Sequence, residues 1–123
     1  MKRANVGASA TAYGTLVLSE RTIAMHRLVI RESDQFPEVA TAFYEAAIRR
    51  ANDAVARWLR RQCERRLIVL EDPQAAAGML RGMMSMDPQR AVMLGQRAAP
   101  DQEEIAERAK QCARLFLDGC LAR

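Results

Sequence analysis

The boundary near residue 36, where one helical pattern ends and a much longer one begins, constrains this chain most. Met25 to Ile30 is an apolar-periodic segment that runs into the polar stretch Arg31 to Gln35. Pro37 follows, and proline is favoured at the first helical position because its fixed φ suits a helix and its missing N–H would be unpaired there. No other proline occurs before Pro73. We therefore predict one helix from Pro37 to about Arg66, up to about eight turns at ~3.6 residues per turn.

Capping residues divide the rest of the chain into further helices. The first is expected from about Ala8 to Leu18. Ser19 has a side-chain oxygen that suits the start of a second helix, expected at about Glu20 to Ser33. Asp72 and Pro73 repeat the cap and first-turn pattern at the start of a fourth helix, expected to end near Leu94. Asp87 and Pro88 lie inside that helix, so it either breaks there or bends sharply.

The last helix is predicted after Gly95 and Pro100 by a variant of the capping box. Asp101 stands at the cap position and Glu104 three residues later, where its carboxylate reaches back to the cap amide. One apolar seam follows at helical spacing: Ile105, Ala109, Cys112, Phe116 and Cys120.

Composition agrees with an all-α fold. Half of the 123 residues are apolar and only six are aromatic, while good helix formers such as Ala, Leu, Arg, Glu and Met dominate. We predict six or seven helices in one bundle-like domain spanning residues 1–123. On the long helix, spacing of three and four residues gives one broad stripe: Ala40, Phe43, Ala47, Ala51, Val55, Trp58, Leu59 and Gln62.

Several classes of protein are disfavoured by what the chain contains. Apolar runs are far shorter than the ~20 residues of a membrane span, and no signal-peptide pattern begins the chain, so we expect a cytoplasmic protein without membrane contact. Cys63, Cys112 and Cys120 form neither a paired framework nor a zinc motif. Free cysteine is usually buried, and the alternative of a redox sensor would need an exposed thiol of low pKa.

The sequence contains few residues that could form a catalytic site. His26 is the only histidine, and the sequence supplies neither a nucleophile for it nor an orienting third group. No phosphate-binding glycine loop or metal-ligand motif occurs. We expect no enzyme activity, no cofactor and no bound metal.

The basic character of the chain has two readings. A net charge of +4 and a pI near 9.4 are compatible with nucleic-acid binding. However, Asp53 lies four residues from both Arg49 and Arg57 on the long helix, so much of the charge is paired locally. A solvated face of mixed charge is the better interpretation.

Three segments, in order, resemble a known family. His26 to Ser33 followed by Phe36-Pro37-Glu38-Val39-Ala40 and Phe43-Tyr44-Glu45 is similar to the C-terminal domain of TetR-family transcriptional regulators, in particular the AefR-like subgroup. Leu70 to Ala77 resembles the Asp-Pro start of the family's eighth helix, and Ala113 to Gly119 the end of its ninth. The resemblance covers roughly residues 10 to 122 and implies a bacterial transcription regulator with a TetR-like C-terminal fold.

The resemblance also points to a missing part. Family members carry an N-terminal helix-turn-helix, and nothing like it precedes Tyr13. We expect residues 1–12 to be a remnant of the helix that connects to such a DNA-binding domain. No segment resembles a recognition helix, so DNA would be a partner only through the missing domain.

In such regulators the effector cavity lies among the helices predicted here as second, third and fourth. Methionine lines adaptable binding surfaces but also fills cores, and His26 would be either a polar anchor or a core histidine bonded to backbone. The resemblance implies these candidate ligand-binding residues: Met25, His26, Val29, Phe43, Ala47, Trp58, Met79 and Met83.

The fourth and last helices are expected to build a symmetric homodimer. In the family, the equivalent helices of two subunits form a four-helix bundle, and small residues would allow close approach. The candidate interface residues are Ala76, Leu80, Met83, Ala109, Cys112, Ala113, Phe116 and Gly119.

The sequence thus suggests an effector-binding and dimerisation domain that binds an apolar small molecule and controls operator binding by its parent protein. The alternative is a stand-alone helical interaction module without a ligand. An internal pocket would separate the two, because only the first requires one.

Overall fold

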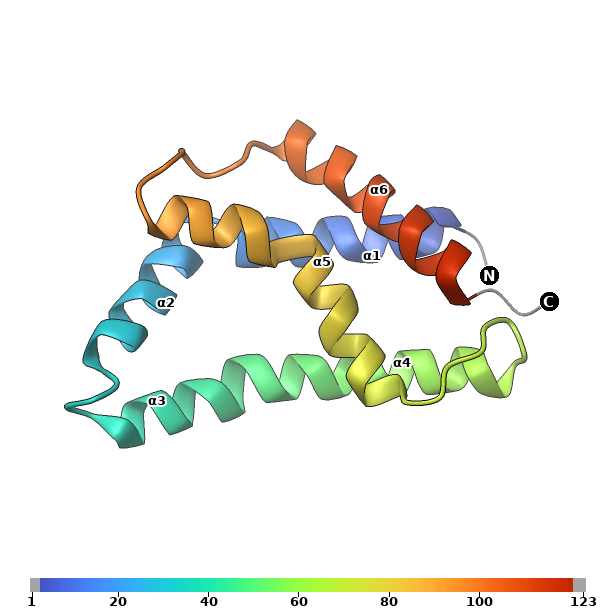
Figure 1. The fold of residues 1–123 in the computed structure, drawn as a ribbon, viewed down its shortest axis with the longest axis horizontal. Helices are drawn as coiled ribbons and strands as arrows, with labels where there is room; N and C mark the ends of the chain where they lie inside the picture. The colour runs from blue at the N-terminus through green and yellow to red at the C-terminus, as the bar shows by residue number, and fades with distance from the viewer. Residues whose placement is uncertain (1–2, 121–123) are drawn as a thin grey trace.

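The computed structural model describes residues 3–120, which are helical almost throughout (Figure 1). The elements in chain order are α1 (Arg3–Val17), α2 (Glu20–Glu32), α3 (Pro37–Phe43), η1 (Tyr44–Arg49), α4 (Arg50–Glu64), α5 (Pro73–Met93) and α6 (Gln102–Cys120). The all-α prediction is confirmed. The predicted count of six or seven helices was too high: α3, η1 and α4 join end to end as one helix, as predicted, and α5 does not break at Pro88, so residues 3–120 form five helices.

The long central helix begins where the sequence placed it, with Pro37 in the first turn of α3. Its middle was not predicted: η1 is a π-helical segment, whose i→i+5 hydrogen bonds widen the turn. Backbone angles stay helical through both junctions, at Tyr44 and at Arg49. The predicted helix from Pro37 to about Arg66 is therefore one continuous rod with a widened turn in it.

Local capping follows the sequence closely. The Ser19 hydroxyl accepts a hydrogen bond from the Thr22 N–H, and the Asp72 carboxylate accepts from the N–H groups of Gln74 and Ala75. Asp101 likewise accepts from the Glu104 N–H at 2.8 Å. The second half of the predicted capping box is wrong, because the Glu104 carboxylate binds Arg97 instead of turning back to the cap amide.

α5 continues through Pro88 as one helix, and Figure 1 shows that this helix is bent. Proline has no N–H, so it leaves the carbonyl of Met84, four residues earlier, without its usual helical donor. Arg108 on α6 fills that gap: its Nε donates to the Met84 carbonyl and its Nη2 to the Met83 carbonyl, each at 2.7 Å. These two hydrogen bonds connect α5 to α6 in the turn before Pro88.

α1 packs mainly along α6, and α5 crosses from α4 to α1 (Figure 1). The core divides into two clusters of buried side chains. One gathers Val6, Leu59, Ile68 and Leu117, while the other gathers Leu18, Met84, Ile105 and Cys112. α1 begins earlier than the predicted Ala8, because Val6 has Leu59 and its neighbours to pack against.

The chain leaves α4 through a left-handed residue. Arg66 has a φ of +62°, the N–H of Arg66 donates to the Cys63 carbonyl, and the N–H of Leu67 donates to the Gln62 carbonyl. These paired bonds form a Schellman motif, in which glycine is the usual residue at this position. The apolar link that follows packs as extended chain, with Ile68 buried and the Val69 N–H bonded to the Cys120 carbonyl.

Candidate functional site

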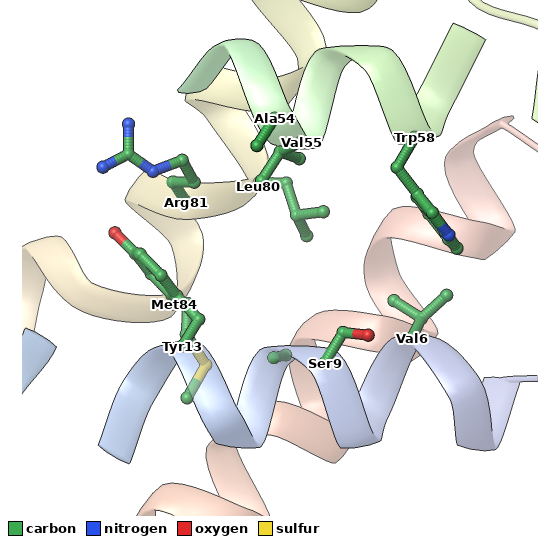
Figure 2. A pocket seen from close by; sticks show the side chains of 10 residues that line it. Val6, Ser9, Tyr13, Ala54, Val55, Trp58, Leu80, Arg81 and Met84 are labelled. Atoms are coloured by element: carbon green, nitrogen blue, oxygen red, sulfur yellow. The ribbon is translucent and has the colours of Figure 1, made fainter. Parts of the chain in front are cut away.

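A cavity of about 250 Å³ lies between α1, α4 and α5 (Figure 2). Two of its lining residues, Ser9 and Ala54, are exposed, so the cavity opens to solvent between α1 and α4. Its wall consists of ten residues: Val6, Ser9, Ala10, Tyr13, Ala54, Val55, Trp58, Leu80, Arg81 and Met84.

Helical spacing explains why these residues share one space. On α1, Val6, Ala10 and Tyr13 recur at intervals of four and three residues and therefore lie on one face. Leu80 and Met84 do the same on α5. Most of the wall is apolar, as in known small-molecule sites, where a few polar groups fix the ligand's orientation.

Two of the polar groups, those of Tyr13 and Arg81, lie at one end of the cavity, whereas the Ser9 hydroxyl lies near Val6. Figure 2 shows the Tyr13 hydroxyl and the Arg81 guanidinium on the same side, with Trp58 and Val6 at the opposite side. The guanidinium carbon lies 5.4 Å from the centre of the Tyr13 ring, within the range of a cation–π contact. The Tyr13 hydroxyl lies 3.2 Å from the Ser85 hydroxyl, which donates to the Arg81 carbonyl.

Arg81 also connects the cavity to the long helix. Its Nη1 donates to the carbonyl of Ile48 at 3.2 Å and to the Asn52 side-chain oxygen at 3.5 Å. Ile48 belongs to the π-helical segment η1. Among residues 3–120, the buried Arg81 Nε has no hydrogen-bond partner. The groups described as holding Arg81 are therefore all neutral, and one of them, the Ile48 carbonyl, lies in the π-helical segment.

Of the residues expected to line an effector cavity, the structure places only Trp58 in this wall. His26 lies on α2, where its Nδ1 is 2.9 Å from the Thr22 carbonyl and its ring meets Phe43 edge-on at 4.9 Å. This is the arrangement of a histidine bonded to backbone. The other six lie elsewhere, either exposed (Met25, Ala47 and Met79) or half-buried (Val29, Phe43 and Met83).

The expected dimer residues divide in a similar way. Ala109, Cys112 and Ala113 are buried within the single chain, on the side of α6 that packs on α1, and Ala76 is buried in the core. This seam therefore packs inside the subunit, because α1 covers it. Leu80 lines the cavity, and Met83 and Phe116 are half-buried. Gly119 is exposed, with no atom near the position of a Cβ.

The sequence analysis did not predict most of the cavity residues, although one feature of the sequence could have indicated Arg81. Arg81 is the only charged residue between Ala75 and Met86, where the helix otherwise carries alanine, glycine, methionine, one leucine and one serine. Burying a lone cation in an apolar helix costs free energy unless a partner compensates the charge. Such a cation is therefore a candidate for binding a partner group. The contribution of α1 had no such signal, because its pattern of small residues is not amphipathic.

The family described as the AefR-like transcriptional repressor, C-terminal domain, matches residues 6–119. The chain belongs to this family of TetR-type domains. The match includes all three elements that form the cavity. No curated protein matches the chain.

Two solved structures of regulators share the fold of this AefR-like domain. A TetR-family transcriptional regulator from Mesorhizobium loti MAFF303099 has a TM-score of 0.91 and 23% identity, over 98% of this chain and 60% of that one. The flavonoid-responsive regulator FrrA has a TM-score of 0.76 and 24% identity, over 89% of this chain and 56% of that one. The chain thus spans less than two thirds of the length of either regulator.

Two further observations concern residues 3–120. No group of three or more His, Cys, Asp or Glu side chains there is placed to hold a metal ion. None of the described helices combines the length and the apolar character needed to cross a membrane.

Proposed function

We propose that this AefR-like domain is the effector-binding part of a transcriptional regulator and that an apolar small molecule binds between α1, α4 and α5. The cavity carries the proposal: it is largely apolar, open on one side and lined by three helices of the family domain. Its polar groups are few, and two of them, the Tyr13 hydroxyl and the Arg81 guanidinium, lie together, which suits oriented binding.

The position of α1 supports a regulatory role. α1 supplies Val6, Ala10 and Tyr13 to the cavity and is the first element of the described chain. A ligand that contacts α1, α4 and α5 together binds some relative positions of these helices better than others. It therefore shifts the population between a form that favours operator binding by the parent regulator and one that does not.

Size limits the ligand. A cavity of about 250 Å³ lies just below the roughly 300–1,000 Å³ of drug-sized sites, whereas an apolar cavity of about 150 Å³ holds one benzene ring. We propose ligands with one or two rings inside the wall. The fold likeness to a flavonoid-responsive regulator makes flavonoids a reasonable first panel; they have three rings, so one ring would extend through the open side of the cavity.

Fluorescence of Trp58, the only tryptophan, provides the test. Titration with a flavonoid panel should change Trp58 emission in a saturable way. Ala54→Phe places a ring at the mouth of the cavity and should abolish that change, at little cost in stability because Ala54 is exposed.

Ala47→Phe is the matched control, since Ala47 is an exposed alanine on the same long helix but outside the cavity wall. Its emission change should equal that of the unaltered chain. An equal loss in both variants, or no saturable binding by any member of the panel, would count against a ligand site here and favour an interaction module without ligand.

We also propose that the regulator is a homodimer that uses α5 and α6, as the family resemblance implies. The exposed apolar side chains of these helices support this: Met79 and Met86 on α5 are 68% and 49% exposed, and Leu115 on α6 is 66% exposed. Met79 and Met86 are seven residues apart and lie on one face, with Gly82 between them.

A further inference from the structure

The structure points to the chemical class of the ligand, given the cavity proposed above. We propose that the cavity takes an amphipathic organic anion whose carboxylate, or equivalent acidic group, pairs with Arg81. The apolar body of that molecule would lie toward Trp58 and Val6, at the other end of the cavity (Figure 2).

The charge of Arg81 is the first reason. A guanidinium stays protonated at any physiological pH, so a partly buried arginine relies on partners rather than on neutralisation. The partners of Arg81 are neutral: the Ile48 carbonyl, the Asn52 amide oxygen and the face of the Tyr13 ring. Its Nε is buried and has no hydrogen-bond acceptor among the described residues.

The second reason is that the described part of the chain brings no carboxylate to this cation. Three ion pairs occur among the described residues, and all of them lie outside the cavity wall: Arg31 with Glu32, Arg49 with Glu45, and Arg97 with Glu104. The ten lining residues include neither Asp nor Glu. Asp53 on α4 instead accepts a hydrogen bond from the Gln74 side chain at 2.8 Å.

The third reason is the distribution of chemistry along the cavity. The Arg81 and Tyr13 end offers a cation and a hydroxyl, while Val55, Trp58, Leu80 and Met84 make most of the rest apolar. The Ser9 hydroxyl, near Val6, is the exception among the lining residues. A carboxylate accepts paired N–H groups from a guanidinium, and such charge-assisted bonds are stronger than neutral ones. An organic acid with a compact hydrophobic body therefore matches both ends, whereas a hydrocarbon matches only one.

A purely structural role does not account for this arrangement. The bond to the Ile48 carbonyl needs one N–H donor, and a guanidinium has five. Had stabilisation of η1 been the whole role, the remaining donors would be expected to have acceptors or solvent. The Nε has no acceptor among the described residues and Arg81 lines the cavity, so part of the hydrogen-bonding capacity of this side chain is unused.

Two probes of the same shape test the charge. 4-tert-Butylbenzoate is anionic at pH 7.5, and 4-tert-butylbenzamide is its neutral counterpart. Titration calorimetry with the full chain should show the acid binding at least tenfold tighter than the amide. Arg81→Gln should remove that preference while leaving amide affinity unchanged, and Arg81→Lys should retain part of it.

Arg90→Gln is the matched control, because Arg90 is an exposed arginine on the same helix and its loss changes net charge equally. It should leave the ratio of the two affinities unaltered. Unchanged amide binding by Arg81→Gln also shows that the variant is folded. If that variant does not fold, the ratio in the unaltered chain and in Arg81→Lys decides.

The possible failures are distinguishable. Equal affinity for acid and amide would overturn the anion proposal and leave the ligand-binding function standing. If neither probe binds but a neutral flavonoid changes Trp58 emission, the anion proposal also falls alone. If no probe binds in either assay, both proposals fall.

Discussion

Arg66 shows how much a single backbone angle matters. A residue other than glycine in the left-handed region costs roughly 1–2 kcal/mol, and the exposed Arg66 side chain has no hydrogen bond or ion pair within residues 3–120 that would offset this cost. Arg66→Gly should therefore raise the free energy of unfolding by about 0.5–1 kcal/mol, the remainder being offset by the greater freedom of glycine in the unfolded chain. Urea denaturation measures the change.

Gly95 provides the reverse experiment, because it occupies the equivalent position after α5 with a φ of +73°. Gly95→Ala should lower the free energy of unfolding by about 1 kcal/mol. Changes of the same sign in the two variants would contradict the argument.

The cysteines make a second prediction at the residue scale. Burial raises the pKa of the Cys112 thiol and of the Cys120 thiol, with Cys63 adding to the effect at Cys120. In the native protein at pH 8, a disulfide reagent such as Ellman's should therefore modify the half-buried Cys63 first. Equal rates at all three thiols would contradict the interpretation that Cys112 and Cys120 are core residues.

The same shifts set a dependence of stability on pH. Because the folded state holds these thiols protonated, their contribution is complete below the unfolded pKa of about 8.5 and is lost as pH rises through the folded values. The unfolding free energy should fall above about pH 9, and less so in a Cys112→Ala, Cys120→Ala variant. Denaturant titrations across pH 7 to 10 would measure the difference.

At the scale of elements, the bend in α5 depends on a residue of another helix. Arg108 donates to the carbonyls of Met83 and Met84, in the turn that precedes Pro88. Removing these donors by Arg108→Met should cost about 1.5–3 kcal/mol, the usual range for a hydrogen bond to a charged group.

A double-mutant cycle with Pro88→Ala tests whether the stabilisation by Arg108 depends on the N–H that Pro88 lacks. Alanine restores the N–H that the Met84 carbonyl lacks, so Arg108→Met should cost about half as much in the Pro88→Ala background. Additive effects of the two substitutions would show that Arg108 stabilises the protein independently of the bend.

At the scale of the whole molecule, the proposed dimer predicts which exposed apolar residues matter. Met79→Glu and Leu115→Glu should each shift the protein from dimer to monomer, since a charge on a buried interface is costly. Neither should reduce the stability of the subunit, because both positions are exposed. Sedimentation equilibrium at micromolar concentrations distinguishes the two states.

Leu16→Glu is the matched control, because Leu16 on α1 is 68% exposed, as is Met79. It should leave the dimer intact. A monomeric unaltered chain, or equal dissociation by all three substitutions, would contradict an interface formed by α5 and α6.

The sequence by itself determined the elements. Ser19, Pro37, Asp72 and Asp101 mark helix starts because capping involves groups no more than about four residues apart, so that neighbouring residues decide the outcome. The all-α class followed from composition and periodicity for the same local reason. The segments shared with AefR-like domains also predicted the family correctly.

Only the tertiary structure decided which faces meet. The seam of α6 was recognised as apolar, but α1 and a second subunit would bury such a seam equally well, and the structure places it against α1. The cavity likewise depends on where α5 crosses α1 and α4, which brings Tyr13 and Arg81 together although 68 residues separate them in sequence. Periodicity states which face of a helix is to be buried; only the packing of the whole chain selects its partner.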